Sequence, residues 1–195
     1  EKTFPAERAF ADRAHADAAA TAFLDELLRN GTTTAMVFGS VHRASVDALF
    51  TAALDRNMRL IAGKSLMDRG PEDLRDTIDG GRTETEALIR DWGRRGRLGY
   101  AVTPRFALSS SPEQLAVAGD ILGAHDHVWM QTHLAENPRE VAAVAGAFPD
   151  ARDYLDVYDR FGLVTDRSVF AHAIHMTDRS LHRMAQAGAA ISHCP

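Results

Sequence analysis

Short apolar segments alternate with longer amphipathic segments along almost the whole chain, and this alternation restricts the fold more than any other feature. Each apolar segment has five or six residues, is rich in β-branched, aromatic or aliphatic side chains, and is bounded by polar or turn residues. The predicted strands cover residues 33–38, 60–64, 98–103, 128–133, 168–172 and 189–194. Repeated alternation of strands and helices predicts an α/β fold with a parallel sheet.

The segments between the strands contain recognisable helix signals. Ser111 followed by Pro112 predicts the start of a helix, and Gln114 completes a capping box, in which two side chains satisfy free backbone amides. Residues 6–29 predict one long opening helix, and residues 154–161 predict a short additional one.

Two architectures accommodate six βα units: an open doubly wound sheet and a large part of a (β/α)₈ barrel. A doubly wound sheet binds its cofactor on a G-x-G-x-x-G turn, and no predicted strand is followed by one. A barrel collects its functional groups at the carboxyl ends of its strands, where the unusual residues of this sequence concentrate. We therefore expect a (β/α)₈ barrel of the α/β class, with about six βα units in a single domain spanning residues 1–195.

Basic and imidazole side chains stand at or just after the ends of the predicted strands: Lys64, Arg105, His133, His172 and His193. A buried guanidinium or imidazole is unfavourable unless it is paired or coordinated, so packing alone does not explain this pattern. Because strand ends share one mouth in a barrel, we expect a functional site there. For Lys64 we expect a structural partnership with a carboxylate, and for His193 a packing or supporting role.

The pattern His133-x-x-Glu136 is typical of a hydrolytic metal centre. His133 at a strand end would be a metal ligand, and Glu136 in the following turn would move protons beside the ion. His172, at the end of the next strand, would supply a second nitrogen ligand. The pair alone is a weak signal, and the neighbouring histidine strengthens it.

Other residues near the strand ends are candidates for contact with a substrate. Arg105 is either a surface ion-pair residue or, together with the aromatic ring of Phe106, a binding element for a planar polar substrate. Gln131, His175 and His42 are candidates for lining the same pocket.

Composition excludes several classes of protein. The chain carries 22 lysines and arginines against 27 aspartates and glutamates, a net charge of −5, which argues against a nucleic-acid-binding surface or a polybasic membrane anchor. The one cysteine, Cys194, excludes an intramolecular disulfide and a cysteine zinc finger. No apolar run approaches the roughly 20 residues of a membrane span, so we expect a cytoplasmic protein.

Six sequence runs, in their order and spacing, resemble the guanine deaminase family of the amidohydrolase superfamily. They are LRNGTTTA at 28–35, MRLIAGKSLMDR at 58–69, TPRFA at 103–107, QTHLAEN at 131–137, FAHAIHM at 170–176 and SHCP at 192–195. The resemblance implies a distorted (β/α)₈ barrel that hydrolyses guanine to xanthine and ammonia. It also implies one zinc ion per chain, with iron as the alternative, and a homodimer.

The family's functional positions fall on residues that the strand ends already indicate. The resemblance makes His133 and His172 metal ligands, Glu136 the acid and base, and Arg105 and Phe106 the residues that contact guanine. Arg105 would hold the purine carbonyl, which adenine lacks.

The family's H-x-H pair on the first barrel strand and its aspartate after the eighth are absent from the sequence. We therefore expect this chain to be the middle of a longer enzyme. Two alternatives stay open: an amidohydrolase that acts on another aminated heterocycle, such as a triazine, a pterin or an adenosine derivative, and a non-catalytic relative that keeps the barrel as a binding module.

Overall fold

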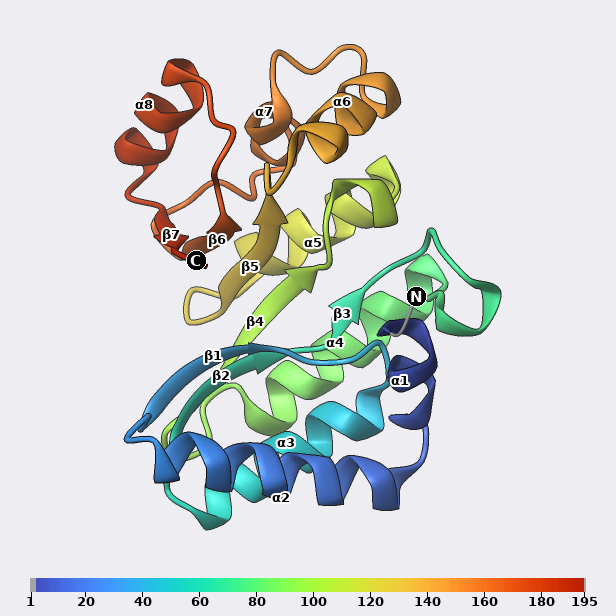
Figure 1. The fold of residues 1–195 in the computed structure, drawn as a ribbon, viewed down its shortest axis with the longest axis vertical. Helices are drawn as coiled ribbons and strands as arrows, with labels where there is room; N and C mark the ends of the chain where they lie inside the picture. Colours follow the sequence, from blue (N-terminus) through green and yellow to red (C-terminus); the bar gives the residue numbers. More distant parts are fainter. Residues whose placement is uncertain (1–2, 195) are drawn as a thin grey trace.

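The computed structural model describes residues 3–194, which form one parallel sheet surrounded by helices (Figure 1). The strands are β1 (Thr34–Phe38), β2 (Arg59–Gly63), β3 (Ser65–Leu66), β4 (Leu98–Pro104), β5 (Trp129–Leu134), β6 (Ser168–His172) and β7 (Ala190–Ser192). Their order in the sheet is β1-β2-β4-β5-β6-β7, with the short β3 pairing beside β4. Every pairing is parallel.

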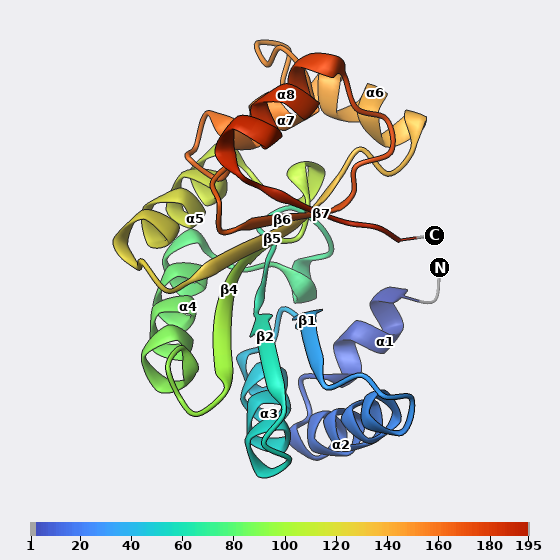
Figure 2. The ribbon, with the colours of Figure 1, turned by 90° about the vertical axis from the view of Figure 1, so that its left-hand side faces the viewer.

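Helices precede β1 and connect most of the later strands. They are α1 (Thr3–Ala9), α2 (Arg13–Arg29), α3 (Arg43–Asp55), α4 (Ile78–Trp92), α5 (Pro112–Ala124), α6 (Pro138–Ala147), α7 (Tyr154–Asp159) and α8 (Asp178–Ala187). Figure 2 shows the sheet curling, with α3, α4 and α5 on its convex side and with β1 and β7 at its two ends. This is a partial (β/α) barrel, which confirms the predicted fold class.

The predicted strands agree with the observed ones to within two residues at either end. β3 is a strand that the sequence patterns did not indicate, because two residues are too few to show a periodicity. β7 covers Ala190–Ser192 and is shorter than the predicted segment 189–194; its residues are exposed at the end of the sheet.

The opening helix was predicted as one element over 6–29, and this prediction is wrong. The chain breaks at Asp12, whose backbone is extended and whose carboxylate accepts a hydrogen bond from the Ala14 amide at 3.1 Å. Aspartate stabilises a helix start by satisfying a free amide, so two helices, α1 and α2, replace one. The helix predicted at 154–161 ends earlier, at Asp159.

The capping box predicted at the start of α5 is half correct. The Ser111 hydroxyl accepts a hydrogen bond from the Gln114 amide at 3.1 Å, as expected of an N-cap. The Gln114 side chain, however, is fully buried, and neither of its amide atoms has a hydrogen-bond partner among residues 3–194. It therefore does not return a bond to the cap.

One large apolar core lies between the sheet and its helices. β4 is buried along its whole length, and its neighbour β2 approaches so closely that a Cβ added at Gly63 would lie 1.7 Å from the Ala101 carbonyl oxygen. Tight packing at the centre of the sheet holds the strand ends in position. None of the described helices is both long enough and apolar enough to cross a membrane.

Candidate active site

The carboxyl ends of β5 and β6 bring His133, Glu136 and His172 together. The imidazole rings of His133 and His172 are stacked with their centroids 5.4 Å apart. The Glu136 Oε1 atom lies 3.8 Å from the His172 Nε2 atom. In the parallel β5–β6 ladder His133 pairs with Ala171 and Leu134 pairs with His172, so the two histidines stand one residue apart at the ends of neighbouring strands. The left-handed backbone of His172 interrupts the regular strand geometry there.

The orientation of the His133 ring is set by a hydrogen bond to the backbone. Its Nδ1 atom lies 2.7 Å from the carbonyl oxygen of Arg105. A carbonyl can only accept, so Nδ1 carries the proton and the lone pair is on Nε2. Burial lowers the pKa of His133, and this favours the neutral ring, the form that binds metals.

The backbone around the site is strained. Ala135, His172 and Ala173 have φ values of 49°, 71° and 48°, in the left-handed region that non-glycine residues seldom adopt. The amide of Ala173 donates to the Leu134 carbonyl at 2.8 Å, which ties the turn after β6 to the end of β5. Strain of this kind concentrates at functional sites, where the surrounding structure maintains it.

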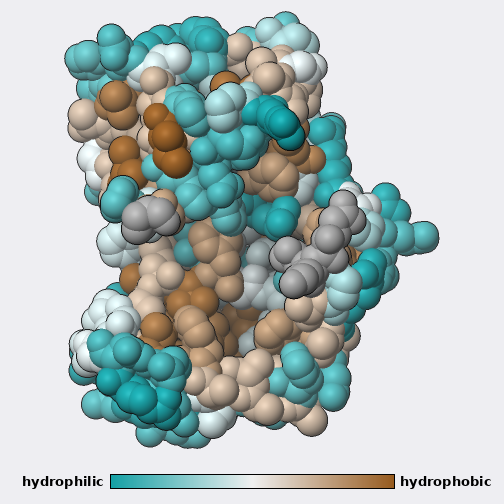
Figure 3. Space-filling model, in the orientation of Figure 1, coloured by the Kyte–Doolittle hydropathy of each residue, from teal (hydrophilic) through white to brown (hydrophobic). Residues whose placement is uncertain are grey.

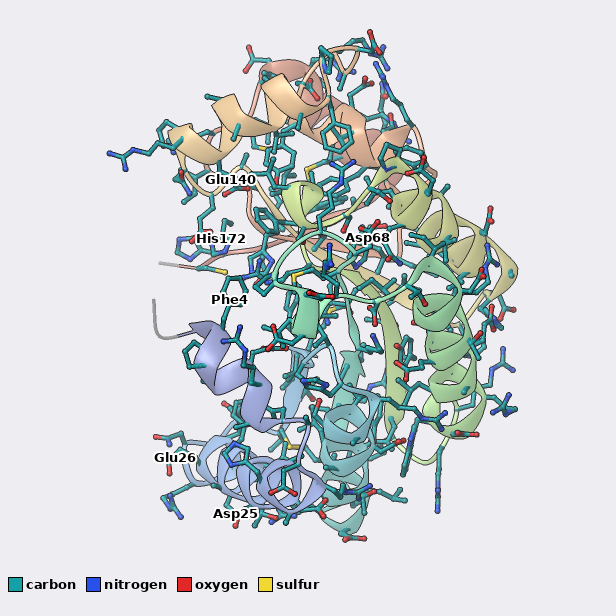
Figure 4. All side chains as sticks on the ribbon, turned by 90° about the vertical axis from the view of Figure 1, so that its right-hand side faces the viewer. Phe4, Asp25, Glu26, Asp68, Glu140 and His172 are labelled. Carbon is teal, nitrogen blue, oxygen red and sulfur yellow. The ribbon has the colours of Figure 1, made fainter. Side chains whose placement is uncertain are left out.

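Arg105 lies against two aromatic rings. Its guanidinium carbon is 5.1 Å from the centroid of the Phe106 ring and 5.8 Å from that of Phe4, on α1. It forms no ion pair with any residue between 3 and 194. Figure 4 shows His172 between Phe4 and Glu140 along one side of the molecule. Phe4 was missed by the sequence patterns, because no spacing connects it to residue 105.

Two cavities meet at these residues. One, of about 410 Å³, is lined by Arg105, Phe106, His133 and Glu136 together with residues of α6. The other, of about 390 Å³, extends between α2 and β1 and also reaches Arg105 and His133. Figure 3 shows apolar side chains gathered around the hollow on this face. Volumes of this size suit a small-molecule ligand.

The other predicted pocket residues lie elsewhere. Gln131 is buried in the interior, where its Nε2 atom donates to the Val37 carbonyl at 2.8 Å and to the Thr103 hydroxyl at 3.1 Å. His42 is the N-cap residue of α3 and lines a cavity with Ala11, between α1 and α2, and with the segment after β3. His175 lines a cavity among α6, α7 and α8. The structure does not bring these residues into the cavity that Glu136 lines.

Lys64 has the structural role that the sequence predicted. Its side chain is fully buried, and its Nζ atom lies 2.5 Å from Asp76 Oδ1 and 3.5 Å from Glu84 Oε2. Burial raises the pKa of Asp76, although the Lys64 ammonium opposes the shift. The pair holds the segment after β3 against the end of β2.

The donors at this site fit a divalent metal ion. Two imidazoles with an adjacent carboxylate suit zinc or another first-row metal. Over residues 3–194, no three histidine, cysteine, aspartate or glutamate side chains are grouped so as to hold a metal. His133 and His172 alone are fewer than the roughly three protein ligands that a catalytic zinc site usually has.

Comparison with known proteins gives a consistent result. A model of the amidohydrolase family matches residues 4–195. Guanine deaminase of Escherichia coli is 47% identical over 194 residues, which cover 99% of this chain and 44% of that protein. Guanine deaminase of Rattus norvegicus is 34% identical over 198 residues, which cover 99% of this chain and 43% of the relative.

A solved structure agrees with these sequence matches. Guanine deaminase from C. acetobutylicum with guanine bound in its active site superposes with a TM-score of 0.95 at 28% identity, covering 99% of this chain and 46% of that one. The chain thus spans less than half the length of the relatives it matches.

Proposed function

The chain belongs to the amidohydrolase family, and we propose that the protein hydrolyses guanine to xanthine and ammonia with the help of one zinc ion. Amidohydrolases are generally metal-dependent. The observation that supports the proposal most is that His133, Glu136 and Arg105 line one cavity, with the His172 ring stacked on that of His133. The 47% identity to a guanine deaminase supports the choice of substrate.

His133, through Nε2, and His172 would hold the metal ion. Bound zinc lowers the pKa of a coordinated water to about 7 and so supplies a nucleophile at neutral pH. The hydrogen bond from His133 Nδ1 to the Arg105 carbonyl keeps the ring in the required tautomer. Iron is the alternative metal, and metal analysis of the purified protein distinguishes the two.

Glu136 would move protons in the reaction. Its side chain is 49% exposed and lines the cavity beside His133. In the reaction the oxygen of water bonds to the carbon that bears the exocyclic amine, and the bond from that carbon to nitrogen breaks. Glu136 would accept a proton from the attacking water and deliver it to the neighbouring ring nitrogen, and would then transfer the proton of the new hydroxyl to the amine, which leaves as ammonia.

Arg105 would select the purine. Its guanidinium can donate to the carbonyl oxygen of guanine while the Phe4 and Phe106 rings limit its movement. Adenine has no oxygen at that position, so it would leave the arginine without an acceptor. Sites built around a hydrogen bond of this kind reject the analogue that lacks the group by about 10⁴-fold or more.

The test is a substrate panel with the full-length protein. Ammonia release is measured with guanine, adenine, an aminotriazine and a pterin, and xanthine release with guanine, for the wild type, Arg105→Ala and Arg90→Ala. Arg90, 71% exposed on α4, is the control. We expect guanine to be the preferred substrate and Arg105→Ala alone to lower its kcat/KM by about 10²-fold. Turnover of the triazine or the pterin with none of guanine would refute the proposal.

We also propose that the protein is a cytoplasmic homodimer with residues 1–195 in a single catalytic barrel domain. The family resemblance supports the homodimer and the single barrel domain. Sedimentation of the full-length protein tests the homodimer.

A further inference from the structure

Tyr158, on α7, is fully buried behind the candidate active site, and its hydroxyl contacts two of the segments that carry the site residues. The hydroxyl donates to the carbonyl of His133 at 2.8 Å and accepts from the amide of Ala107 at 2.9 Å. It also accepts from the Thr132 hydroxyl at 3.2 Å. A phenol has one donor and two acceptor positions, so the hydrogen-bonding capacity of Tyr158 is fully used.

These hydrogen bonds link the His133 segment to the Arg105 segment. The Tyr158 hydroxyl accepts from the Ala107 amide, two residues after Arg105, and the Arg105 carbonyl accepts from His133 Nδ1 at 2.7 Å. The His133 carbonyl in turn accepts from the Tyr158 hydroxyl, which closes the network. One buried hydroxyl thus bonds to the backbone at His133 and at Ala107, two residues after Arg105.

We propose that Tyr158 is a positioning residue that holds His133 in register with Arg105 and Phe106, and so sets both metal affinity and substrate alignment. The inference rests on the proposed function, because it takes His133 as a metal ligand and Arg105 as the substrate-binding residue. Tyr158 itself touches neither metal nor substrate.

A second tyrosine on the same helix separates the role of the hydroxyl from that of the ring. Tyr154 is also buried, and its ring stacks on that of Tyr158 with centroids 5.7 Å apart. Its hydroxyl has no hydrogen-bond partner among residues 3–194. Burial raises the pKa of both phenols, to about 12 for Tyr158, so both hydroxyls stay protonated at neutral pH. Tyr154→Phe is therefore the matched control for Tyr158→Phe.

The experiment measures zinc affinity by competition with a chelator, together with kcat and KM for guanine, in the full-length protein. Residues that orient a metal ligand contribute about 10- to 100-fold in metal affinity or activity. We expect Tyr158→Phe to weaken zinc binding and to lower kcat/KM, each by about that factor, and Tyr154→Phe to change both by less than about 3-fold. Wild-type zinc affinity in Tyr158→Phe, or equal losses in both variants, would overturn the inference.

Three further outcomes are informative. If Tyr158→Phe does not fold, Thr132→Val removes one of the three hydrogen bonds and keeps the side-chain shape; we expect zinc binding about 3-fold weaker, and an unchanged affinity would overturn the inference. If the wild type binds zinc but leaves guanine unchanged, the proposed function fails while the zinc measurements still decide the role of Tyr158. A wild type that binds no zinc refutes both.

Discussion

Replacing Gln131 with leucine tests whether this residue holds strands together or contacts the substrate. The side chain is 3% exposed, and its Nε2 atom links β5 to the Val37 carbonyl on β1 and to the Thr103 hydroxyl on β4. Leucine has a similar volume, so the main change is the loss of two hydrogen bonds. Each contributes about 1 kcal/mol, and acceptors left unpaired add to the loss, so we expect the free energy of unfolding to fall by about 2 kcal/mol.

The assay is urea unfolding of the full-length protein, with kcat and KM for guanine measured alongside. Gln114→Leu is the control, because Gln114 is just as buried but has no side-chain hydrogen bond with any described residue. Removing an unsatisfied polar group should leave stability unchanged or raise it. We expect Gln131→Leu to lose stability and to keep its KM. Wild-type stability with a raised KM would refute the structural role and favour contact with guanine.

The remaining predictions concern the proton-transfer role of Glu136 and the loss of folding stability at low pH. Glu136→Gln should lower kcat by about 10²- to 10⁴-fold with zinc content unchanged; turnover close to that of the wild type would contradict its role. Burial alone would raise the pKa of Asp156, but hydrogen bonds from Arg152 and Arg160 outweigh burial and lower it to about 2. The folded-state pKa is then below the unfolded value of about 3.9, so the carboxylate stabilises the fold above about pH 4, and this contribution disappears as the pH falls through about 2. Because these arginines are largely exposed, we expect a contribution of about 1 kcal/mol; the stability difference between wild type and Asp156→Asn should shrink between pH 5 and pH 2.5, and a constant difference would refute the pairing.

The strand order and the central site residues were predictable because they depend on repeated physical rules. Parallel strands connected by helices place their carboxyl ends along one edge of a sheet, so side chains at the ends of β5 and β6 must be neighbours. This rule predicts the proximity of His133 and His172 before any coordinates are known. The structure confirms it at 5.4 Å between ring centroids.

Residues that lie one turn away from a strand end were not predictable in the same way. His175 follows β6, but the left-handed backbone at His172 and Ala173 turns the chain, and the imidazole lines a cavity among α6, α7 and α8. Gln131 precedes His133 by two residues on the same face of β5, and it lies deeper in the interior. Side-chain direction in these places depends on local dihedral angles, which the apolar pattern does not encode.

Phe4 and Tyr158 show a second limit. Both reach the site from helices distant in sequence, α1 and α7, and neither belongs to a motif at a strand end. Their contacts with Arg105 and with His133 arise only when the helices pack onto the sheet. A buried tyrosine in a short helix resembles an ordinary core residue until its hydroxyl partners are known.

The most direct measurement is a crystal structure of the full-length protein with anomalous diffraction recorded on both sides of the zinc absorption edge. We predict one anomalous peak per chain, bonded to Nε2 of His133 and to a ring nitrogen of His172, with the carboxylate of Glu136 beside it but not bonded. A peak elsewhere on the protein, or both imidazoles facing away from a bound ion, would contradict the assignment of this site.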